Sequence, residues 1–177
     1  MYKIEKYGVT FIRLNPSLLE TVRSWRNSEN VRPFMQNQNV IAKKDQITWF
    51  KSINNDRNYY FVAHIKKDPI GLFNIKDIDH DNKVGECGSF LKSSEYWETK
   101  ESMCFHFLLI HVAFELLGLK QVVCTILNTN KKTIALNLQI GYVKDEKNSD
   151  ESISKYRLTY NSFLKSKGAR LLKYIDK

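Results

Sequence analysis

The fold is constrained most by one long apolar segment that lies between two β-rich runs. Residues 96–102 read YWETKES, and the apolar run MCFHFLLIHVAFELL follows and ends at Gly118. A run of this length predicts a buried helix, and a glycine just past its end is a common helix stop. The runs VGECGSFL before it and QVVCTIL after it have the composition of strands. Strands joined by a helical crossover lie parallel, so residues 84–127 should contain a parallel strand pair.

The remaining segments predict further helices and antiparallel strands around that unit. The runs GVTFIRL, YYFVAHI and IGLFNI read as strands, and turn signals lie at residues 67–69 and 79–82. Apolar residues at helical spacing predict helices, which we expect over residues 17–27, 43–53 and 129–140. Strands should follow at residues 141–143 and 153–160, with a short helical extension within residues 162–177. This order favours an α/β or α+β fold with one central mixed sheet.

Length and composition favour a single domain over residues 1–177. The chain has 177 residues, 42% of them hydrophobic, and contains no repeat or linker. No apolar run is long enough to span a membrane, and the N-terminus lacks a signal-peptide core. Cys87, Cys104 and Cys124 lie in apolar segments, which suits reduced thiols better than disulfides or a zinc site. We therefore expect a cytoplasmic protein with no membrane partner and no metal.

The charge of the chain is compatible with two explanations. The formal net charge is +9 and the isoelectric point is about 9.4. A solvated, lysine-rich surface accounts for this charge, and so does a partner that carries phosphates, either nucleic acid or a nucleotide-bearing small molecule. The basic residues are not interleaved with aromatic residues in a stacking array, so we do not expect a nucleic-acid partner.

The polar start of the long helix is a candidate binding site. A loop that ends a strand and opens a helix presents free N–H groups and the positive end of the helix dipole, which favour an anion. Thr99 or Ser102 can cap the helix, and Lys92 and Lys100 add positive charge. The alternative is a capped helix start with two surface lysines, because three glutamates oppose a phosphate and residues 89–117 contain no glycine.

Three segments resemble the GNAT-type N-acetyltransferase superfamily. EYWETKES (95–102), with the helix ending AFELLGLKQV, resembles the EYWGKGxG segment of the branch that acetylates ribosomal-protein N-termini and sugar nucleotides. NTNKKTIALNLQIGY (128–142) resembles the family segment NxxAIxLYEKLGF. SWRNSENVRPFMQNQNVI (24–41) is similar to the WRN-x-x-x-VR-x-x-M pattern of enzymes that acetylate nucleotide-linked amino sugars, as in the pseudaminic-acid pathway. The resemblance implies a mostly antiparallel sheet whose one parallel pair splays at the cofactor site.

The chain departs from the family pattern at four positions. Lys100 and Ser102 replace the two glycines of the pyrophosphate loop, and Asn137 replaces the usual tyrosine acid. Gln46 replaces a histidine that is common in the sugar-nucleotide members. The changes at Lys100 and Ser102 bear on coenzyme affinity, and the change at Asn137 bears on the identity of the proton donor.

The resemblance implies that acetyl-coenzyme A is the cosubstrate and lies between strands 84–91 and 121–127. The pantetheine arm would pair with the first strand, and the pyrophosphate would face the start of the long helix. The implied coenzyme-binding residues are Phe90, Leu91, Lys92, Trp97, Lys100, Glu101, Ser102, Met103, Asn130 and Thr133.

Glu86 is the candidate general base. Residues 86, 88 and 90 share one strand face, and a carboxylate there can take the proton of an ammonium group directly or through water. The alternative is a solvated glutamate. Asn137 is no acid, but its amide can hydrogen-bond a thiolate. Tyr142 is the nearest phenol in the sequence, although its family position usually holds a packed aromatic residue.

A further set of residues follows the first predicted helix and can bind the acceptor. Guanidinium groups suit phosphates, and apolar side chains can stack on a base or sugar. The candidates are Trp25, Arg26, Asn27, Arg32 and Met35. The alternative places Trp25 in the core and leaves the arginines solvated or paired with Glu29.

The leading hypothesis is an acetyl-coenzyme A-dependent N-acetyltransferase that acts on a nucleotide-linked deoxyamino sugar in bacterial surface-glycan synthesis. A second hypothesis keeps the reaction and changes the acceptor to a protein N-terminus or a small amine. A third is a non-catalytic or nucleic-acid-binding module with the same fold. A sheet edge expected after Ile153 also allows a homodimer.

Overall fold

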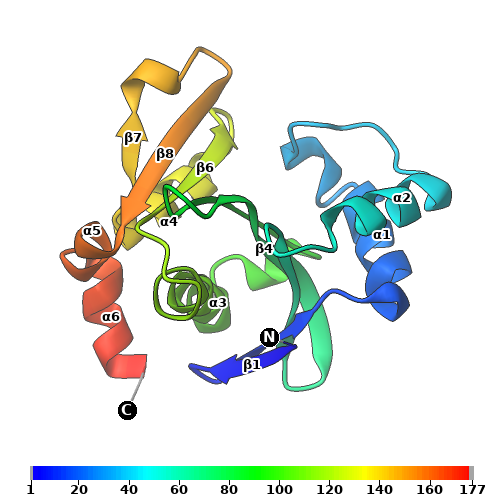
Figure 1. The fold of residues 1–177 in the computed structure, drawn as a ribbon, viewed down its shortest axis with the longest axis horizontal. Helices are drawn as coiled ribbons and strands as arrows, with labels where there is room; N and C mark the ends of the chain where they lie inside the picture. The colour runs from blue at the N-terminus through cyan, green and yellow to red at the C-terminus, as the bar shows by residue number, and fades with distance from the viewer. Residues whose placement is uncertain (1, 176–177) are drawn as a thin grey trace.

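A mixed β-sheet organises residues 2–175, which are the residues that the computed structural model describes. Its strand order is β1-β2-β3-β4-β5-β6-β8-β7 (Figure 1). The strands are β1 (Lys3–Lys6), β2 (Val9–Arg13), β3 (Tyr59–Ile65), β4 (Asp68–Asp79), β5 (Val84–Leu91), β6 (Gln121–Leu127), β7 (Val143–Asp145) and β8 (Ile153–Thr159).

The pair β5–β6 is parallel, and the other neighbouring strands in this sheet are antiparallel. This confirms the parallel pair that the crossover predicted. The pairing is short: Val84, Gly85 and Glu86 of β5 lie opposite Gln121, Val122 and Val123 of β6. Beyond these three residues the two strands part, so the carboxyl half of β5 is paired with β4 alone.

Helices cover both faces of the sheet (Figure 1). One face carries α1 (Leu19–Asn27) and α2 (Lys43–Ile53), and the sheet curves around α3 on the other face. The remaining helical segments are α4 (Lys131–Ile140), α5 (Tyr160–Leu164), α6 (Lys167–Ile175), the π-helical turn Val112–Leu116 that extends α3 (Lys100–His111), and short 3-10 turns at Pro16–Leu18, Arg32–Phe34, Ser94–Tyr96 and Glu146–Asn148.

An aromatic stack attaches α3 to the sheet. Phe105 of α3 has no exposed surface; it stacks against Phe11 and packs at a tilt against Phe73, with ring centroids 5.9 and 5.4 Å away. Burial of rings of this size contributes strongly to stability. The stack therefore determines where the N-terminus of α3 lies relative to the end of β5.

Several predicted boundaries differ from the structure. The strand β8 pairs with β6 on one side and β7 on the other, so the sheet edge expected after Ile153 is wrong and β7 forms that edge. The C-terminal extension is two helices, because the chain turns near Ser166 between α5 and α6. The helix expected from residue 129 begins at Lys131, since Asn130 caps it. Gly118 takes the left-handed conformation (φ +62°) after the helix, as predicted.

Within residues 2–175, no helix is both long and apolar enough to cross a bilayer. The same residues contain no group of three or more His, Cys, Asp or Glu side chains placed to hold a metal ion.

Candidate active site

A cavity of about 600 Å³ lies where β5 separates from β6. Its walls come from the end of β5, the start of α3, the start of α4 and the loop between α1 and α2. The wall includes seven of the predicted coenzyme-binding residues, namely Phe90, Leu91, Trp97, Ser102, Met103, Asn130 and Thr133, and one predicted acceptor residue, Met35. Residues far apart in the sequence therefore meet at the place that the strand–helix–strand unit predicted.

The start of α3 is capped as the sequence suggested. The Thr99 hydroxyl accepts a hydrogen bond from the Ser102 backbone N–H at 3.1 Å. The predicted cations Lys92 and Lys100 lie outside the cavity wall, as does Glu101. Lys92 instead donates to Asp68 at 2.9 Å, and the adjacent carboxylate raises the pKa of Lys92 against the opposing effect of burial. The charge of Lys92 is therefore compensated by a strand-end aspartate.

Two contacts close the rim of the cavity. Glu98 and Lys132 form an ion pair of 2.8 Å between the entry to α3 and the first turn of α4. Phe34 from the α1–α2 loop meets Trp97 edge to face, with ring centroids 5.5 Å apart. The hydrogen bond from Lys132 lowers the pKa of Glu98. Trp97 and Glu98 thus border the cavity without filling it.

Replacing Glu98 with glutamine is expected to tighten binding of coenzyme A by about two- to fivefold, because exposed ion pairs contribute only about 0.2–1 kcal/mol and the change frees Lys132 for a phosphate. Isothermal titration calorimetry with coenzyme A measures this. The matched control is Glu95→Gln, which removes an exposed glutamate from the same loop without touching the ion pair. Equal affinities for Glu98→Gln and wild type would contradict the role of Lys132.

Polar side chains surround Glu86 on the face of the sheet that carries α1 and α2. Lys76 of β4 lies opposite Glu86 of β5 in the sheet, and their charged groups are 3.3 Å apart. Lys76 also pairs with Asp77 at 3.0 Å. Tyr60 is buried beside them, and burial raises its pKa to about 12. Glu86 is thus an ion-paired, partly exposed carboxylate and not an isolated surface residue.

Arg26 and Asn27 support the α1–α2 loop next to this face. Asn27 exchanges two hydrogen bonds with the backbone of Ile41, so its amide is used to hold the loop. Arg26 donates from Nη2 to the Asn37 carbonyl at 2.6 Å, whereas its buried Nη1 has no hydrogen-bond partner in the described chain. Burial lowers the pKa of Arg26. Arg26 therefore retains an unused donor.

The same loop reaches the parted strands. The Gln36 amide donates to the carbonyl of Thr125 on β6 at 3.5 Å. Trp25 packs partly buried against the core under α1 and α2, as the core alternative proposed. Arg32 lies in the short turn Arg32–Phe34 and outside the cavity wall. The loop between α1 and α2 thus connects Arg26 to the edge of the opening.

Asn137 and Tyr142 lie on the face of the sheet opposite to Glu86, among thiols. Asn137 donates from Nδ2 to the Cys124 Sγ at 3.2 Å, and the Tyr142 hydroxyl hydrogen-bonds with Cys87. Burial raises the pKa of Cys87 to about 12 and that of Tyr142 above its ordinary value. These groups are neutral and internally satisfied, so the structure groups two of the three predicted catalytic residues with each other and separates them from Glu86.

His106 lines the cavity, although its place in an apolar helix favours a satisfied core or edge histidine when the sequence is read alone. It lies one helical turn after Ser102, and both line the cavity. Its Nδ1 is 2.8 Å from the Ser102 carbonyl oxygen, which requires the proton to be on Nδ1. Burial lowers the pKa of His106, which favours the neutral ring with Nε2 as an acceptor. The i, i+4 spacing of Ser102 and His106 could have indicated this position from the sequence, because it places both side chains on one face of the helix.

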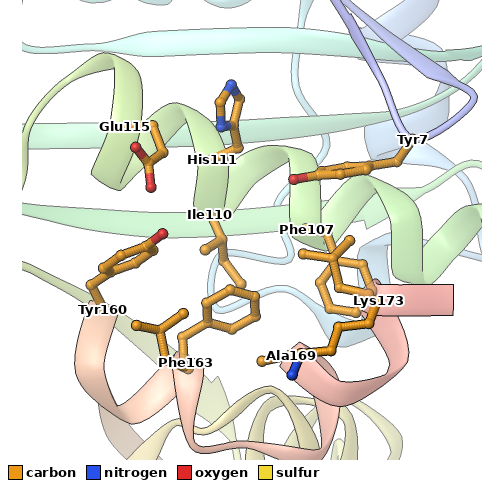
Figure 2. Close-up of a pocket in the computed structure, with 11 residues that line it drawn as sticks. Tyr7, Phe107, Ile110, His111, Glu115, Tyr160, Phe163, Ala169 and Lys173 are labelled. Atoms are coloured by element: carbon orange, nitrogen blue, oxygen red, sulfur yellow. The ribbon is translucent and has the colours of Figure 1, made fainter. Parts of the chain in front are cut away.

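A second cavity, of about 350 Å³, is separate from this site and shares none of its lining residues. It lies between α3, α5, α6 and the β1–β2 turn, and aromatic and aliphatic side chains form most of its wall (Figure 2). Figure 2 shows the Glu115 carboxylate and the Tyr160 hydroxyl directed toward each other, and Glu115 raises the pKa of Tyr160. It is accordingly not part of the candidate active site.

Comparison with known proteins agrees with this geometry. Residues 9–143, more than half of the chain, match the model of the acetyltransferase (GNAT) domain. Among solved structures, spermidine N-acetyltransferase from Vibrio cholerae, in complex with CoA and spermine, is 15% identical with a TM-score of 0.79, over 90% of this chain and 99% of that chain. A domain from Methanocaldococcus jannaschii is 15% identical with a TM-score of 0.74, over 85% of this chain and 97% of that chain. Curated protein sequences provide no match.

The structural likenesses show a shared fold at low identity, whereas the family match covers the strands, helices and loops that build the cavity. The chain therefore belongs to the GNAT acetyltransferase family and is an N-acetyltransferase whose cosubstrate is acetyl-coenzyme A.

Proposed function

We propose that the enzyme acetylates the amino group of a small acceptor that carries an anionic group, with a nucleotide-linked deoxyamino sugar as the best candidate. The observation that supports this most is the unused, buried Nη1 donor of Arg26. An unpaired guanidinium N–H in a native protein calls for an explanation, and a phosphate oxygen is a suitable partner for it. The branch of the family with the WRN-x-x-x-VR pattern has the same acceptor class.

The cavity fits the coenzyme on chemical grounds. Lys131 and Lys132, in the first turn of α4, supply cations for phosphates, and Leu91 and Met103 supply an apolar wall. The end of β5 is unpaired on the side of β6, so its backbone groups are available to an amide-bearing chain. When bound, acetyl-coenzyme A supplies a thioester whose acetyl group is transferred to an amine. Lysine charge replaces the close backbone approach that glycines provide in related loops.

The charge of the acceptor side favours an anion over a polyamine. The segment 28–42 between α1 and α2 contains one carboxylate, Glu29, and one guanidinium, Arg32. Glu86 is already paired with Lys76, and the chain carries a net charge of +9. A polyamine bears several positive charges and needs unpaired carboxylates, whereas a diphosphate is attracted by the net positive charge of the chain. The proposal therefore differs from the activity named for the Vibrio cholerae structure.

The chain's own residues have distinct roles in the proposed reaction. An amine becomes a nucleophile only when it is neutral, so a base must remove the ammonium proton. Glu86 takes this proton directly or through water, and Lys76 holds the carboxylate in place at 3.3 Å. Arg26 binds the anionic part of the acceptor. Asn137 already donates to the Cys124 Sγ on the other face of the sheet, so the proposed step does not use it.

An acceptor panel tests the proposal. Release of free thiol from acetyl-coenzyme A is measured with a nucleoside-diphosphate-linked amino sugar, the same sugar without the nucleotide, spermidine and an N-terminal peptide. We expect kcat/KM to be at least about tenfold higher for the nucleotide-linked sugar, which corresponds to about 1.4 kcal/mol. Preference for spermidine or for the peptide would contradict the anionic acceptor while leaving the acetyltransferase activity in place.

Changing Arg26 to methionine is expected to raise KM for the anionic acceptor by about 10- to 100-fold, since a hydrogen bond to a charged group contributes about 1.5–3 kcal/mol. The KM for the sugar without the nucleotide should stay unchanged. Arg23→Met is the matched control, because Arg23 lies one turn earlier on α1 and already pairs with Glu20 at 2.6 Å. Equal losses for charged and uncharged acceptors would mean that Arg26 only supports the loop.

A further inference from the structure

We infer that Asn74 orients the acceptor amine, with its side-chain carbonyl oxygen accepting one amine N–H over the open backbone of Gly88. This inference rests on the proposed acetyl transfer at Glu86 and assigns a new substrate-orienting residue to it. Asn74 lies on β4, directly opposite Gly88 of β5 and two residue pairs away from the ion pair of Lys76 and Glu86.

The first argument concerns position along β5. Glu86, Gly88 and Phe90 point to the same face, with Glu86 in the last residue pair shared with β6 and Phe90 in the cavity wall. An amine that must reach both the base and the coenzyme cavity has to lie between them. The position between them is Gly88. Because it has no side chain, the Asn74 amide is the nearest side-chain group at this point of the sheet.

The second argument concerns unused hydrogen-bonding capacity. The Oδ1 atom of Asn74 is buried and has no hydrogen-bond partner in the described chain, although the residue as a whole is partly exposed. An unsatisfied buried carbonyl destabilises the fold, so its presence calls for an explanation, and a catalytic role is one of them. A neutral amine has an N–H to donate and a lone pair to direct at the acetyl group. A carbonyl oxygen that fixes one N–H thereby helps to aim the lone pair.

The third argument is steric. A Cβ added to Gly88 would lie 3.1 Å from Nδ2 and 3.2 Å from Oδ1 of Asn74. A side chain at position 88 would therefore press on the amide and cover it, so glycine keeps the Asn74 amide in its place. Tyr60, opposite Asn74 on the other side, is held by its edge-to-face contact with Trp49 at 5.0 Å. Asn74 is thus supported from β3, and its amide lies directly against Gly88 of β5.

Asn74→Leu tests the inference, because leucine keeps the approximate volume and removes the acceptor. We expect kcat for the amine to fall by about 10- to 100-fold, the cost of a misoriented reactant, with unchanged affinity for coenzyme A by calorimetry. Because Oδ1 has no internal partner, Tm should stay the same or rise. Gly88→Ala should lower kcat similarly through steric cover of the amide.

Asn74→Asp supplies a readout that a merely structural amide would not affect. A carboxylate next to the bound amine stabilises the ammonium form, so the acidic limb of the kcat profile should shift to higher pH. Wild-type kcat in Asn74→Leu would overturn the inference alone, as would an unshifted profile in Asn74→Asp. A lower Tm with a parallel loss of coenzyme affinity would also overturn it. A wild-type enzyme that acetylates no amine would overturn both the inference and the proposed function.

Discussion

Replacing Glu86 with glutamine is expected to lower kcat/KM for the acceptor amine by about 10²- to 10⁴-fold, the usual contribution of a positioned general base. Glutamine keeps the size of the side chain and cannot take a proton, so the ammonium form of the acceptor persists. Thiol release with the preferred acceptor measures the loss. Affinity for coenzyme A should be unchanged, because Glu86 lies outside the cavity wall and on the face that carries α1 and α2.

Asp77→Asn is the matched control for this change. Asp77 and Glu86 share the same partner, Lys76, at 3.0 and 3.3 Å. Both variants therefore leave Lys76 with one carboxylate instead of two, and only Glu86→Gln removes the proposed base. Comparable losses in the two variants would assign the effect to Lys76 and reject Glu86 as the base. Partial recovery of Glu86→Gln at high pH, where the amine is already neutral, would support the assignment.

Truncating Phe105 to alanine is expected to lower the free energy of unfolding by about 3–5 kcal/mol, the usual cost of removing a fully buried phenylalanine. Its ring stacks on Phe11 and packs at a tilt on Phe73, so the change opens a cavity between α3 and the sheet. Since domains are typically stable by about 5–15 kcal/mol, a large part of the folded population would be lost on mild heating. Urea denaturation followed by circular dichroism measures the change.

The control for this truncation lies at the end of the same helical segment. Leu116 is 44% exposed, so Leu116→Ala should cost far less than Phe105→Ala. A difference of less than about 1 kcal/mol between the two would contradict the role of the aromatic stack, because exposed substitutions are usually within ±0.5 kcal/mol. In the folded fraction of Phe105→Ala, weaker coenzyme binding is expected, since the stack sets the position of the α3 N-terminus.

Local signals in the sequence predicted several parts of the site. Thr99 caps α3 and Gly118 ends its extension, as residue type and position indicated. Asn130 caps α4 and brings its own side chain to the cavity wall. Caps and stops depend on hydrogen bonds between residues about three apart, so the sequence contains the whole interaction.

Contacts between distant segments were predicted poorly. Lys92 was expected at the coenzyme, and it pairs with Asp68, which lies 24 residues earlier. Lys132 was not singled out, and it reaches Glu98, which lies 34 residues earlier. Ion pairs of this kind depend on which strand and helix ends meet, and nothing in the neighbouring sequence distinguishes one lysine from another.

The sequence by itself determined the order of strands and helices, the parallel pair flanking α3 and the membership of a family that acetylates amines. Apolar periodicity, caps and the crossover rule are properties of consecutive residues, so they can be read along the chain. Only the tertiary structure decided that the parallel pairing stops at Glu86, that Glu86 meets Lys76 and that Asn74 lies over Gly88. These features depend on the registration of strands across the sheet, where packing of both faces selects one alignment among several that the sequence allows.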